Sequence, residues 1–279
     1  MEFWKMHGAG NDFIIVDNRK KVIENKPQTA IEVCDRHFGV GADGLVLVEY
    51  SQAYDIKMDF YNSDGSHATM CGNAIRCFVK YVFDNKILDK AAFTVETGDG
   101  PKEATVLNTD EKESVVKVNM GRWDFSAPTV IPNITDANGK EYICQQIEVL
   151  DKSFELSCVH MGVPHGVILV DEICEEDTIR YGSVLEKHPD FPQGINVNFV
   201  KVIDESHIEV DTWERGAGKT LACGTGICSS AIIANFLNKI GKTVEVKAAG
   251  GILKVTLNSG SVIMEGKAVT ICKGTTVHI

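Results

Sequence analysis

The feature that most constrains the fold is an internal repeat at about half the chain length. Cys223 lies 152 positions after Cys71, and at this offset MCGNAI (70–75) aligns with ACGTGI (222–227). A repeat is sought first because it decides the architecture. The alternative is chance similarity between two apolar stretches, but strand, helix and cysteine turn recur in one order. We therefore expect a duplicated unit.

The repeat predicts where the chain divides. A chain of 279 residues is long enough for two domains. We place the boundary near residue 119 and expect the C-terminus to return to the first domain, because chain termini often lie close together. The expected domains are residues 1–119 with 268–279, and residues 120–267.

Strand-like and helix-like segments alternate along both halves, which indicates an α/β chain. Apolar runs predict strands at 13–17, 45–50, 56–62, 166–171, 195–200 and 207–214, and short strands broken by Gly98, Gly100 and Asn108 over 91–119. Helical periodicity predicts helices at 27–38, 73–86, 175–188 and 225–241. The helix at 225–241 has almost no charged face, so we expect it to be buried nearly all round.

Composition excludes several classes of protein. The 28 Lys and Arg residues against 39 Asp and Glu give a net charge of −11, which argues against binding nucleic acid or an anionic membrane. No apolar run reaches the ~18 residues of a transmembrane helix. Nine cysteines, an odd number without a secretory signal or a C-x-x-C pair, argue against disulfides and a metal site. We expect a reduced, cytoplasmic, soluble protein.

Two of the cysteines occupy equivalent places in the repeat. Cys71 and Cys223 each stand in a turn of small residues that leads into a helix. Free N–H groups at a helix start favour a thiolate and can close around a carboxylate. Pseudo-symmetry would place the two thiols on facing sides of an interdomain cleft, where ligand sites are common.

Two thiols on opposite faces of one carbon suit one reaction. A thiolate removes the proton from the α-carbon and a thiol protonates the opposite face, so the configuration inverts. Dipoles aimed at the carboxylate would stabilise the carbanion, so no cofactor is expected. The alternative is that both are ordinary buried thiols, which we do expect of the remaining cysteines: Cys34, Cys77, Cys144, Cys158, Cys174, Cys228 and Cys272.

The motifs resemble the diaminopimelate epimerases and, more broadly, the cofactor-independent two-cysteine amino-acid racemases. The resemblance is carried by KMHGAGNDF (5–13), FGVGADG (38–44), FYNSDGS (60–66), MCGNAIRC (70–77), MGVPH (161–165), INV (195–197) and WERGAGKTLACGTG (213–226). It implies two pseudo-symmetric α/β (α+β) domains, each a mostly antiparallel, barrel-like sheet around a central helix. Proline racemases share this fold, but their first turn typically reads Cys-Gly-His-Gly instead of Cys71-Gly72-Asn73-Ala74.

The resemblance implies epimerisation of L,L-diaminopimelate to the meso form, on the way to lysine and peptidoglycan precursors. It also implies independence of pyridoxal phosphate and metal, and a homodimer. Cys71 and Cys223 resemble the base and acid pair. The other implied substrate-binding residues are Asn11 near the reacting centre, the backbone N–H groups of Gly72, Asn73, Gly224 and Thr225 at the reacting carboxylate, and Asn62, Asn196, Glu214 and Arg215 at the distal amino-acid head.

Three positions depart from the family pattern. Val163 stands where an Asn usually helps to bind the distal carboxylate, and Lys219 stands where Glu is usual. Ala74 replaces a common Gly. Lys219 would either recover a carboxylate contact or be solvated. A racemase of another polar amino acid, such as histidine, therefore remains an alternative, as do a lyase or double-bond isomerase on this fold and a non-catalytic binding protein.

Overall fold

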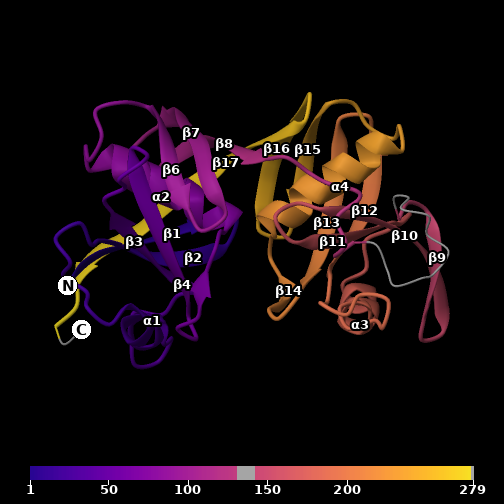
Figure 1. Cartoon of the computed structure of the whole chain (residues 1–279), viewed down its shortest axis with the longest axis horizontal. Coiled ribbons are helices and arrows are strands. Elements are labelled where there is room, and N and C mark those ends of the chain that lie inside the picture. The colour runs from indigo at the N-terminus through magenta and orange to yellow at the C-terminus, as the bar shows by residue number, and fades with distance from the viewer. Residues whose placement is uncertain (131–141, 278–279) are drawn as a thin grey trace. The chain divides into compact units, whose positions relative to one another are not determined.

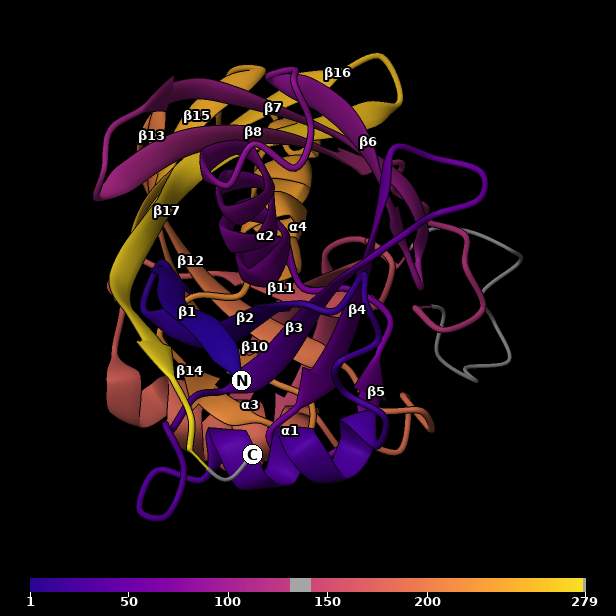
Figure 2. The same cartoon turned by 90° about the vertical axis from the view of Figure 1, so that its left-hand side faces the viewer.

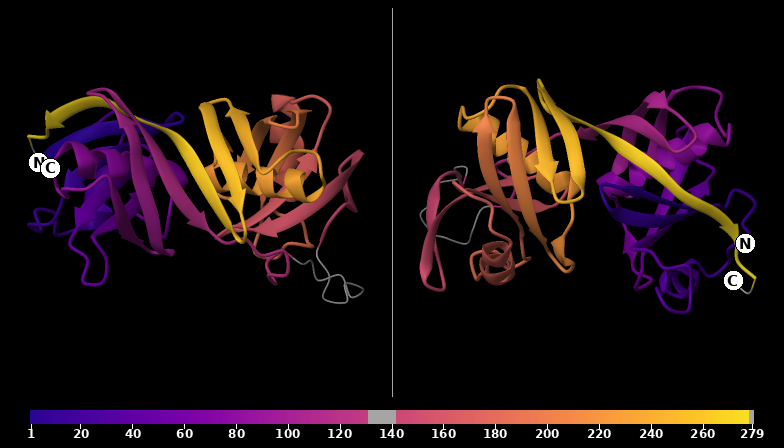
Figure 3. Two further views of the ribbon diagram at one scale, coloured as in Figure 1. Left: turned by 90° about the horizontal axis from the view of Figure 1, so that it is seen from above. Right: turned by 180° about the vertical axis from the view of Figure 1, so that it is seen from behind.

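The chain folds into two compact units, Met1–Asn119 with Glu265–Ile279, and Met120–Met264 (Figure 1). The computed structural model describes residues 1–130 and 142–277, so residues 131–141 and 278–279 of the predicted domains lie outside the described residues. Figure 3 shows strand β17 (Ser261–Thr275), in yellow, which contributes residues to both units. Within the described part of the chain, every helix is too short or too polar to cross a membrane.

The two units contain the same elements in the same order. The first has β1 (Glu2–Gly8), β2 (Asn11–Asp17), α1 (Lys26–Cys34), β3 (Gly44–Glu49), β4 (Ile56–Asn62), β5 (His67–Ala68), α2 (Gly72–Asp84), β6 (Ala92–Thr97), β7 (Gly100–Thr109) and β8 (Glu113–Gly121). The second has β9 (Gln145–Val149), β10 (Lys152–His160), β11 (Pro164–Leu169), α3 (Glu175–Leu185), β12 (Asn196–Asp204), β13 (His207–Glu214), β14 (Gly218–Thr220), α4 (Gly224–Phe236), β15 (Thr243–Ala248) and β16 (Gly251–Asn258), before β17. Only β9 has no counterpart in the described part of the first unit.

Strand pairing closes the first unit into an eight-stranded barrel. The order is β17–β1–β2–β3–β4–β6–β7–β8, and β8 pairs with β17 again. Most pairs are antiparallel, whereas β2–β3 and β4–β6 are parallel. Figure 2 shows α2 inside this ring of strands, where it contacts β1, β2, β3 and β7. The helix is consequently buried from Gly72 to Val82.

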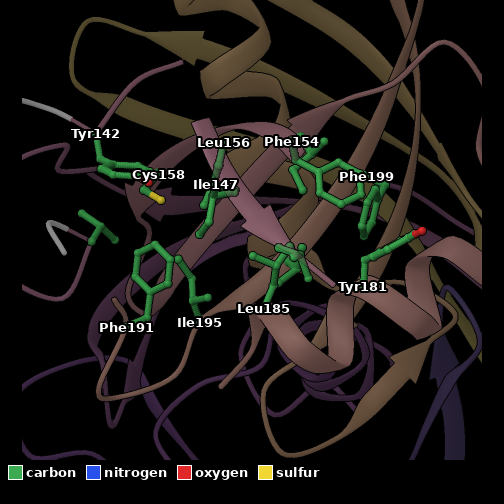
Figure 4. Packing of buried hydrophobic residues seen from close by; sticks show 14 residues of the cluster. Tyr142, Ile147, Phe154, Leu156, Cys158, Tyr181, Leu185, Phe191, Ile195 and Phe199 are labelled. Atoms are coloured by element: carbon green, nitrogen blue, oxygen red, sulfur yellow. The ribbon is translucent and has the colours of Figure 1, made fainter. Parts of the chain in front are cut away.

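The second unit repeats this pairing. β10–β11, β12–β13 and β15–β16 are antiparallel, whereas β11–β12 and β13–β15 are parallel. Alternate residues of a strand face opposite sides, so Val197 and Phe199 of β12 pack in the core beneath α3 while Asn198 faces α4. Figure 4 shows that core, in which Phe154 meets Tyr181 edge-on at 5.0 Å. These observations confirm the predicted fold class: barrel-like sheets around central helices.

The central helices α2 and α4 coincide at the repeat offset of 152 at both ends. Each is followed by a residue in the left-handed conformation, Lys86 (φ 52°) and Asn238 (φ 57°). The next backbone N–H then bonds back to the helix, at 3.0 Å and 2.9 Å, which satisfies a carbonyl that would otherwise be unpaired. The same turn therefore ends both helices, although neither turn contains a glycine.

All four helices end before the predicted residue: α2 ends at Asp84 and α3 at Leu185, two and three residues early, and α1 and α4 end earlier still. The helix expected over 27–38 ends at Cys34, because the Asp35 carboxylate accepts the backbone N–H groups of His37 and Phe38, both at 2.7 Å. This local turn competes with further helix. The helix expected over 225–241 ends at Phe236, because the turn at Asn238 stops it before Gly241.

Strand prediction was incomplete at the edges of the repeat. β1, β5, β9, β10 and β14 to β17 were not predicted, although β1 and β10 each pair on both sides. Asn108 does not break β7, because a register shift between Val106 and Asn108 takes up one residue and the strand continues. The buried helix at 225–241 was correctly predicted, since α4 is buried from Gly226 to Ala234.

The expectation that seven cysteines lie in the core is partly wrong. Cys34, Cys77, Cys158 and Cys228 are buried, but Cys144 is half-buried and Cys174 and Cys272 are exposed. Cys174 precedes α3 as its N-cap residue, and Cys272 lies near the end of β17, where the strand faces solvent. The nine described cysteines are all free thiols.

We expect Lys86→Gly to stabilise the first unit, because glycine adopts the φ of 52° without the cost that a Cβ imposes. The gain in the free energy of unfolding should be about 0.5–1 kcal/mol after the larger chain entropy of glycine, and urea denaturation measures it. Lys86→Ala is the matched control, since it keeps the Cβ and should give no gain. Equal stability of the two variants would contradict this account of the turn.

Candidate active site

Cys71 and Cys223 stand at the start of the two central helices, as their repeat positions predict. Both are N-cap residues with extended backbone, at φ −144°, ψ 122° and φ −100°, ψ 115°. Their carbonyl oxygens accept the first helical hydrogen bonds, from Ile75 at 3.0 Å and Ile227 at 2.9 Å. The backbone N–H groups at positions 72–73 and 224–225 come before these first helical hydrogen bonds, so the helix does not use them and they can bind an anion. They belong to the predicted cradle residues Gly72, Asn73, Gly224 and Thr225.

Glycines allow the barrel wall to approach each of these helix starts. A Cβ on Gly8 of β1 would lie 3.0 Å from the Asn73 carbonyl oxygen in the first turn of α2. A Cβ on Gly226 of α4 would lie 2.3 Å from the Asn198 side-chain oxygen of β12. A side chain at either position would push the helix start away from the strands, so these glycines help to set where the cysteines lie.

In the first unit, two of the predicted residues gather at Cys71. The Asn11 side-chain oxygen lies 3.6 Å from the Cys71 sulfur and accepts from the Asn73 side-chain nitrogen at 3.5 Å. Asn73 is 2% exposed and its oxygen accepts from the buried guanidinium of Arg76 at 2.8 Å. Arg76 also donates to the Gly72 carbonyl at 2.8 Å, which braces the first turn of the helix.

Asn62 lies at the end of β4 and bonds within its own turn. Its side chain donates to the Ser66 hydroxyl at 2.9 Å, and its backbone N–H donates to the Ser66 carbonyl at 2.9 Å. Its strand partner is Gly44. The Asn62 amide thus lies at the strand end, bonded to its own turn. Asn11 contacts Cys71, and Asn73 contacts Asn11.

In the second unit, Cys223 is 5% exposed. Its sulfur accepts from the Gly226 N–H at 3.4 Å and lies 3.4 Å from the Thr225 hydroxyl. Burial raises the pKa of the Cys223 thiol well above its usual range, and the negative charge of Glu214 adds to the rise. The prediction that the helix start favours the thiolate is therefore wrong for Cys223 in this state, because desolvation outweighs the N–H groups.

Asn196 and Arg215, both predicted to recognise the distal end of the substrate, are joined to each other. The Asn196 oxygen accepts from the Arg215 backbone N–H at 2.9 Å, and its nitrogen donates to the Pro164 carbonyl at 2.9 Å. The exposed Arg215 guanidinium donates to the Gln193 carbonyl at 2.6 Å.

Glu214, predicted for the same role, accepts from the Thr220 hydroxyl at 2.6 Å. The alternative that Glu214 and Arg215 form a solvated pair does not hold among the described residues, since neither is the other's partner.

Of the three departures from the family pattern, Ala74 is buried in the first turn of α2, and the other two have defined surroundings. Lys219 forms an ion pair with Asp211 at 2.5 Å, and their side chains are 19% and 8% exposed. It is therefore neither solvated nor unpaired. Val163 is half-buried in the turn before β11, where its carbonyl accepts from the Met161 N–H at 3.0 Å. Its side chain offers no hydrogen bond.

His165 is a residue that sequence reasoning assigned to a structural role. It is fully buried at the start of β11, where Nδ1 lies 3.2 Å from the Asn198 amide nitrogen. Nε2 is buried without a hydrogen-bond partner among the described residues. Burial lowers the pKa of His165 to about 3, so the ring is neutral. An offset of 154 aligns His165 with Asn11, but the strand pairs Phe13–Gly44 and His165–Asn196 show that its counterpart is Phe13, at offset 152.

No group of His, Cys, Asp and Glu suited to a metal ion occurs in the described ranges 1–130 and 142–277.

Comparison with known proteins agrees with the sequence motifs. The family model described as diaminopimelate epimerase matches residues 3–125 and 157–271. The chain is 46% identical to the diaminopimelate epimerase of Clostridium perfringens, covering 99% of both chains. It is 45% identical to the diaminopimelate epimerase of Alkaliphilus metalliredigens, covering 98% of this chain and 96% of the relative.

Solved structures share the fold at low sequence identity. A phenazine biosynthesis protein of the PhzF family from Bacillus anthracis gives a TM-score of 0.72 at 16% identity, covering 99% of both chains. A hydroxyproline epimerase from Agrobacterium vitis gives 0.70 at 13% identity, covering 98% of this chain and 91% of that one. At these identities the likeness shows the fold alone.

The pKa of His165 predicts how stability depends on pH. The native ring takes up a proton only near pH 3, whereas in the unfolded chain it does so near 6.5. Between these values the unfolded state binds more protons, so the free energy of unfolding falls as pH is lowered. From pH 6.5 to 5 the loss should be about 1.5 kcal/mol. Urea denaturation of the wild type and His165→Gln tests this: the variant should lose that part of the slope, and equal slopes would contradict it.

Proposed function

Because the chain belongs to the diaminopimelate epimerase family, we propose that Cys71 and Cys223 are the two bases with which it epimerises L,L-diaminopimelate to the meso form. The reaction is an isomerisation at one α-carbon of a small amino acid. One thiolate takes the α-proton, and the other thiol protonates the opposite face.

The observation that carries this proposal is the equivalent placement of the two cysteines. Each is the N-cap residue of a central helix at the same repeat position. Two-base inversion needs two similar groups on opposite faces of one carbon, and duplication supplies such a pair. The other seven cysteines have no such relation: four are buried in the cores, Cys144 is half-buried, and Cys174 and Cys272 are exposed.

The helix starts would also stabilise the intermediate. Removing the α-proton places negative charge on the neighbouring carboxylate, and fixed dipoles aimed at that group lower the barrier. We propose the N–H groups of Gly72, Asn73, Gly224 and Thr225 for this role. This stabilisation makes an electron-sink cofactor or a metal unnecessary, which is part of the proposal.

The protonation states of the two thiols must differ for turnover in either direction. Groups next to each sulfur bear on that difference: the Asn11 oxygen lies 3.6 Å from Cys71, and the charge of Glu214 acts on Cys223. The two copies of the repeat therefore differ in the groups that surround each thiol, which are the groups that affect whether it holds its proton.

The distal head of the substrate carries both an ammonium and a carboxylate. The exposed Arg215 guanidinium is a planar fork that suits a carboxylate, and the backbone N–H of the same residue donates to Asn196. Glu214 suits an ammonium group, and Asn62 can donate or accept. We assign these four residues to the distal head. We also propose that the protein is a homodimer. A cytoplasmic location is part of the proposal, and nine free thiols are consistent with that reducing compartment.

A racemase of another polar amino acid, such as histidine, is the second candidate. Val163 supplies no donor to a distal carboxylate, and Lys219 is already paired with Asp211. A lost donor opposite a buried carboxylate weakens binding by about 1–3 kcal/mol. These observations concern the distal head and leave the two thiols unchanged.

We expect Cys71→Ser and Cys223→Ser each to lower kcat at least about a hundredfold, because each removes one of the proton-transfer groups. Turnover of L,L-diaminopimelate is measured by chiral chromatography. Cys272→Ser is the control, since this thiol is exposed and lies outside both helix starts. Full activity in either single variant at the helix starts would overturn the two-base assignment.

Incubation in D₂O separates the two candidate substrates. The wild type should place deuterium at the α-carbon of diaminopimelate, read by NMR, without added pyridoxal phosphate or metal. Exchange in L-histidine but not in diaminopimelate would favour the second candidate. Loss of water from an added hydroxy amino acid, seen by mass spectrometry in place of exchange, would point to a lyase.

A further inference from the structure

A chain of hydrogen bonds in the first unit runs from a buried cation to a carboxylate and passes Cys71. Arg76 donates to the Asn73 oxygen at 2.8 Å, and the Asn73 nitrogen donates to the Asn11 oxygen at 3.5 Å. The Asn11 nitrogen then donates to Oδ2 of Asp43 at 2.6 Å. Four residues from α2, β2 and the segment before β3 are thus joined in one line.

The two ends of this chain impose its direction. A guanidinium can only donate, and an ionised carboxylate can only accept. Arg76 therefore turns the Asn73 oxygen toward itself and the Asn73 nitrogen toward Asn11. Asp43 turns the Asn11 nitrogen toward itself, which leaves the Asn11 oxygen facing both Asn73 and the Cys71 sulfur.

We propose that Asp43 is a positioning residue that orients the Asn11 amide so that its oxygen, not its nitrogen, faces Cys71. This inference rests on the proposed role of Cys71 and deepens it. An oxygen acceptor at 3.6 Å stabilises the thiol of Cys71, whereas an amide N–H there would stabilise the thiolate. Asp43 acts on the cysteine through Asn11, whose side-chain nitrogen it accepts from at 2.6 Å.

Asp43 is held firmly enough to impose this orientation. Its Oδ2 also accepts the Asp12 backbone N–H at 3.1 Å, and its Oδ1 accepts from Arg36 at 2.7 Å. Its backbone N–H donates to the Asp12 carbonyl at 2.9 Å, and its carbonyl accepts from Ser63 at 3.1 Å. Asp43 thereby also anchors the turn that follows Asn62.

Charged side chains surround this line of hydrogen bonds. Arg36 bridges Asp43 and Asp12, and Lys5 of β1 pairs with Asp12 at 3.2 Å. Arg76 comes from α2 and also donates to the Lys267 carbonyl of β17 at 3.4 Å. Arg36 and Lys5 therefore balance the negative charges of the Asp12 and Asp43 carboxylates. Arg76 supplies a further positive charge from inside the barrel.

The second unit has no such chain at the equivalent positions. The strand pairs Phe13–Gly44 and His165–Asn196 make Val163 the counterpart of Asn11, and the offset of 152 places Ile195 on Asp43 and Cys228 on Arg76. Isoleucine and a buried cysteine cannot act as the charged ends. The orienting device is therefore specific to Cys71, which agrees with the unlike surroundings of the two thiols.

The test measures alkylation of Cys71 by iodoacetamide at pH 7 without substrate, by peptide mass spectrometry. Asp43→Ala removes the acceptor, so Asn11 can turn its nitrogen toward the sulfur, and the rate should rise about threefold or more. Asp43→Asn keeps an acceptor oxygen and should stay near the wild-type rate. Asp99→Ala is the matched control, because Asp99 is 40% exposed against 43% for Asp43 and pairs only with Lys102.

A double-mutant cycle separates orientation from loosening of the fold. If Asp43 acts through Asn11, Asp43→Ala should change nothing in an Asn11→Ala background. An equal rise in both backgrounds, or exposure of the buried Cys77, would indicate loosening and overturn the proposal. So would an unchanged rate in Asp43→Ala. Activity retained by Cys71→Ser would instead refute the proposed function, and it leaves the alkylation result readable on its own.

Discussion

The structure of each unit depends on burying a helix inside a sheet that curls around it. The first N–H groups of such a helix have no carbonyl partner within the helix, and we propose them as the cradle for the substrate carboxylate. In both units the residue at that point is a cysteine, and a glycine lets the strand or helix come close. The anion cradle and the thiol are thus consequences of one packing requirement.

The two copies of the unit have kept their backbone and diverged in their polar groups. α2 and α4 begin and end at equivalent residues, and even the left-handed residue after each is preserved in position. Around the thiols the copies differ: Cys71 faces an oriented amide, whereas Cys223 is buried beside Glu214. In the proposed two-base reaction, these unlike surroundings would let the two thiols hold their protons differently.

Much of the fold and of the site was predictable because the signals were local or repeated. Apolar runs predicted most strands, and β4 has the predicted limits of residues 56–62. Helix ends were less predictable, because Asp35 ends α1 through a side-chain bond that composition does not reveal. The exposure of Cys174 and Cys272 was not predicted either. A thiol can be buried or exposed, so the residue type alone does not decide its burial.

The sequence by itself determined the duplication, the family, and the two cysteines at helix starts, since all three are written in motifs and their spacing. The tertiary structure decided what surrounds each thiol. Asp43, Asn11, Asn73 and Arg76 come from segments far apart along the chain, and only folding brings their donors and acceptors into one line. The tertiary structure also decided that burial outweighs the helix start at Cys223, because desolvation depends on every neighbour and not on the local turn.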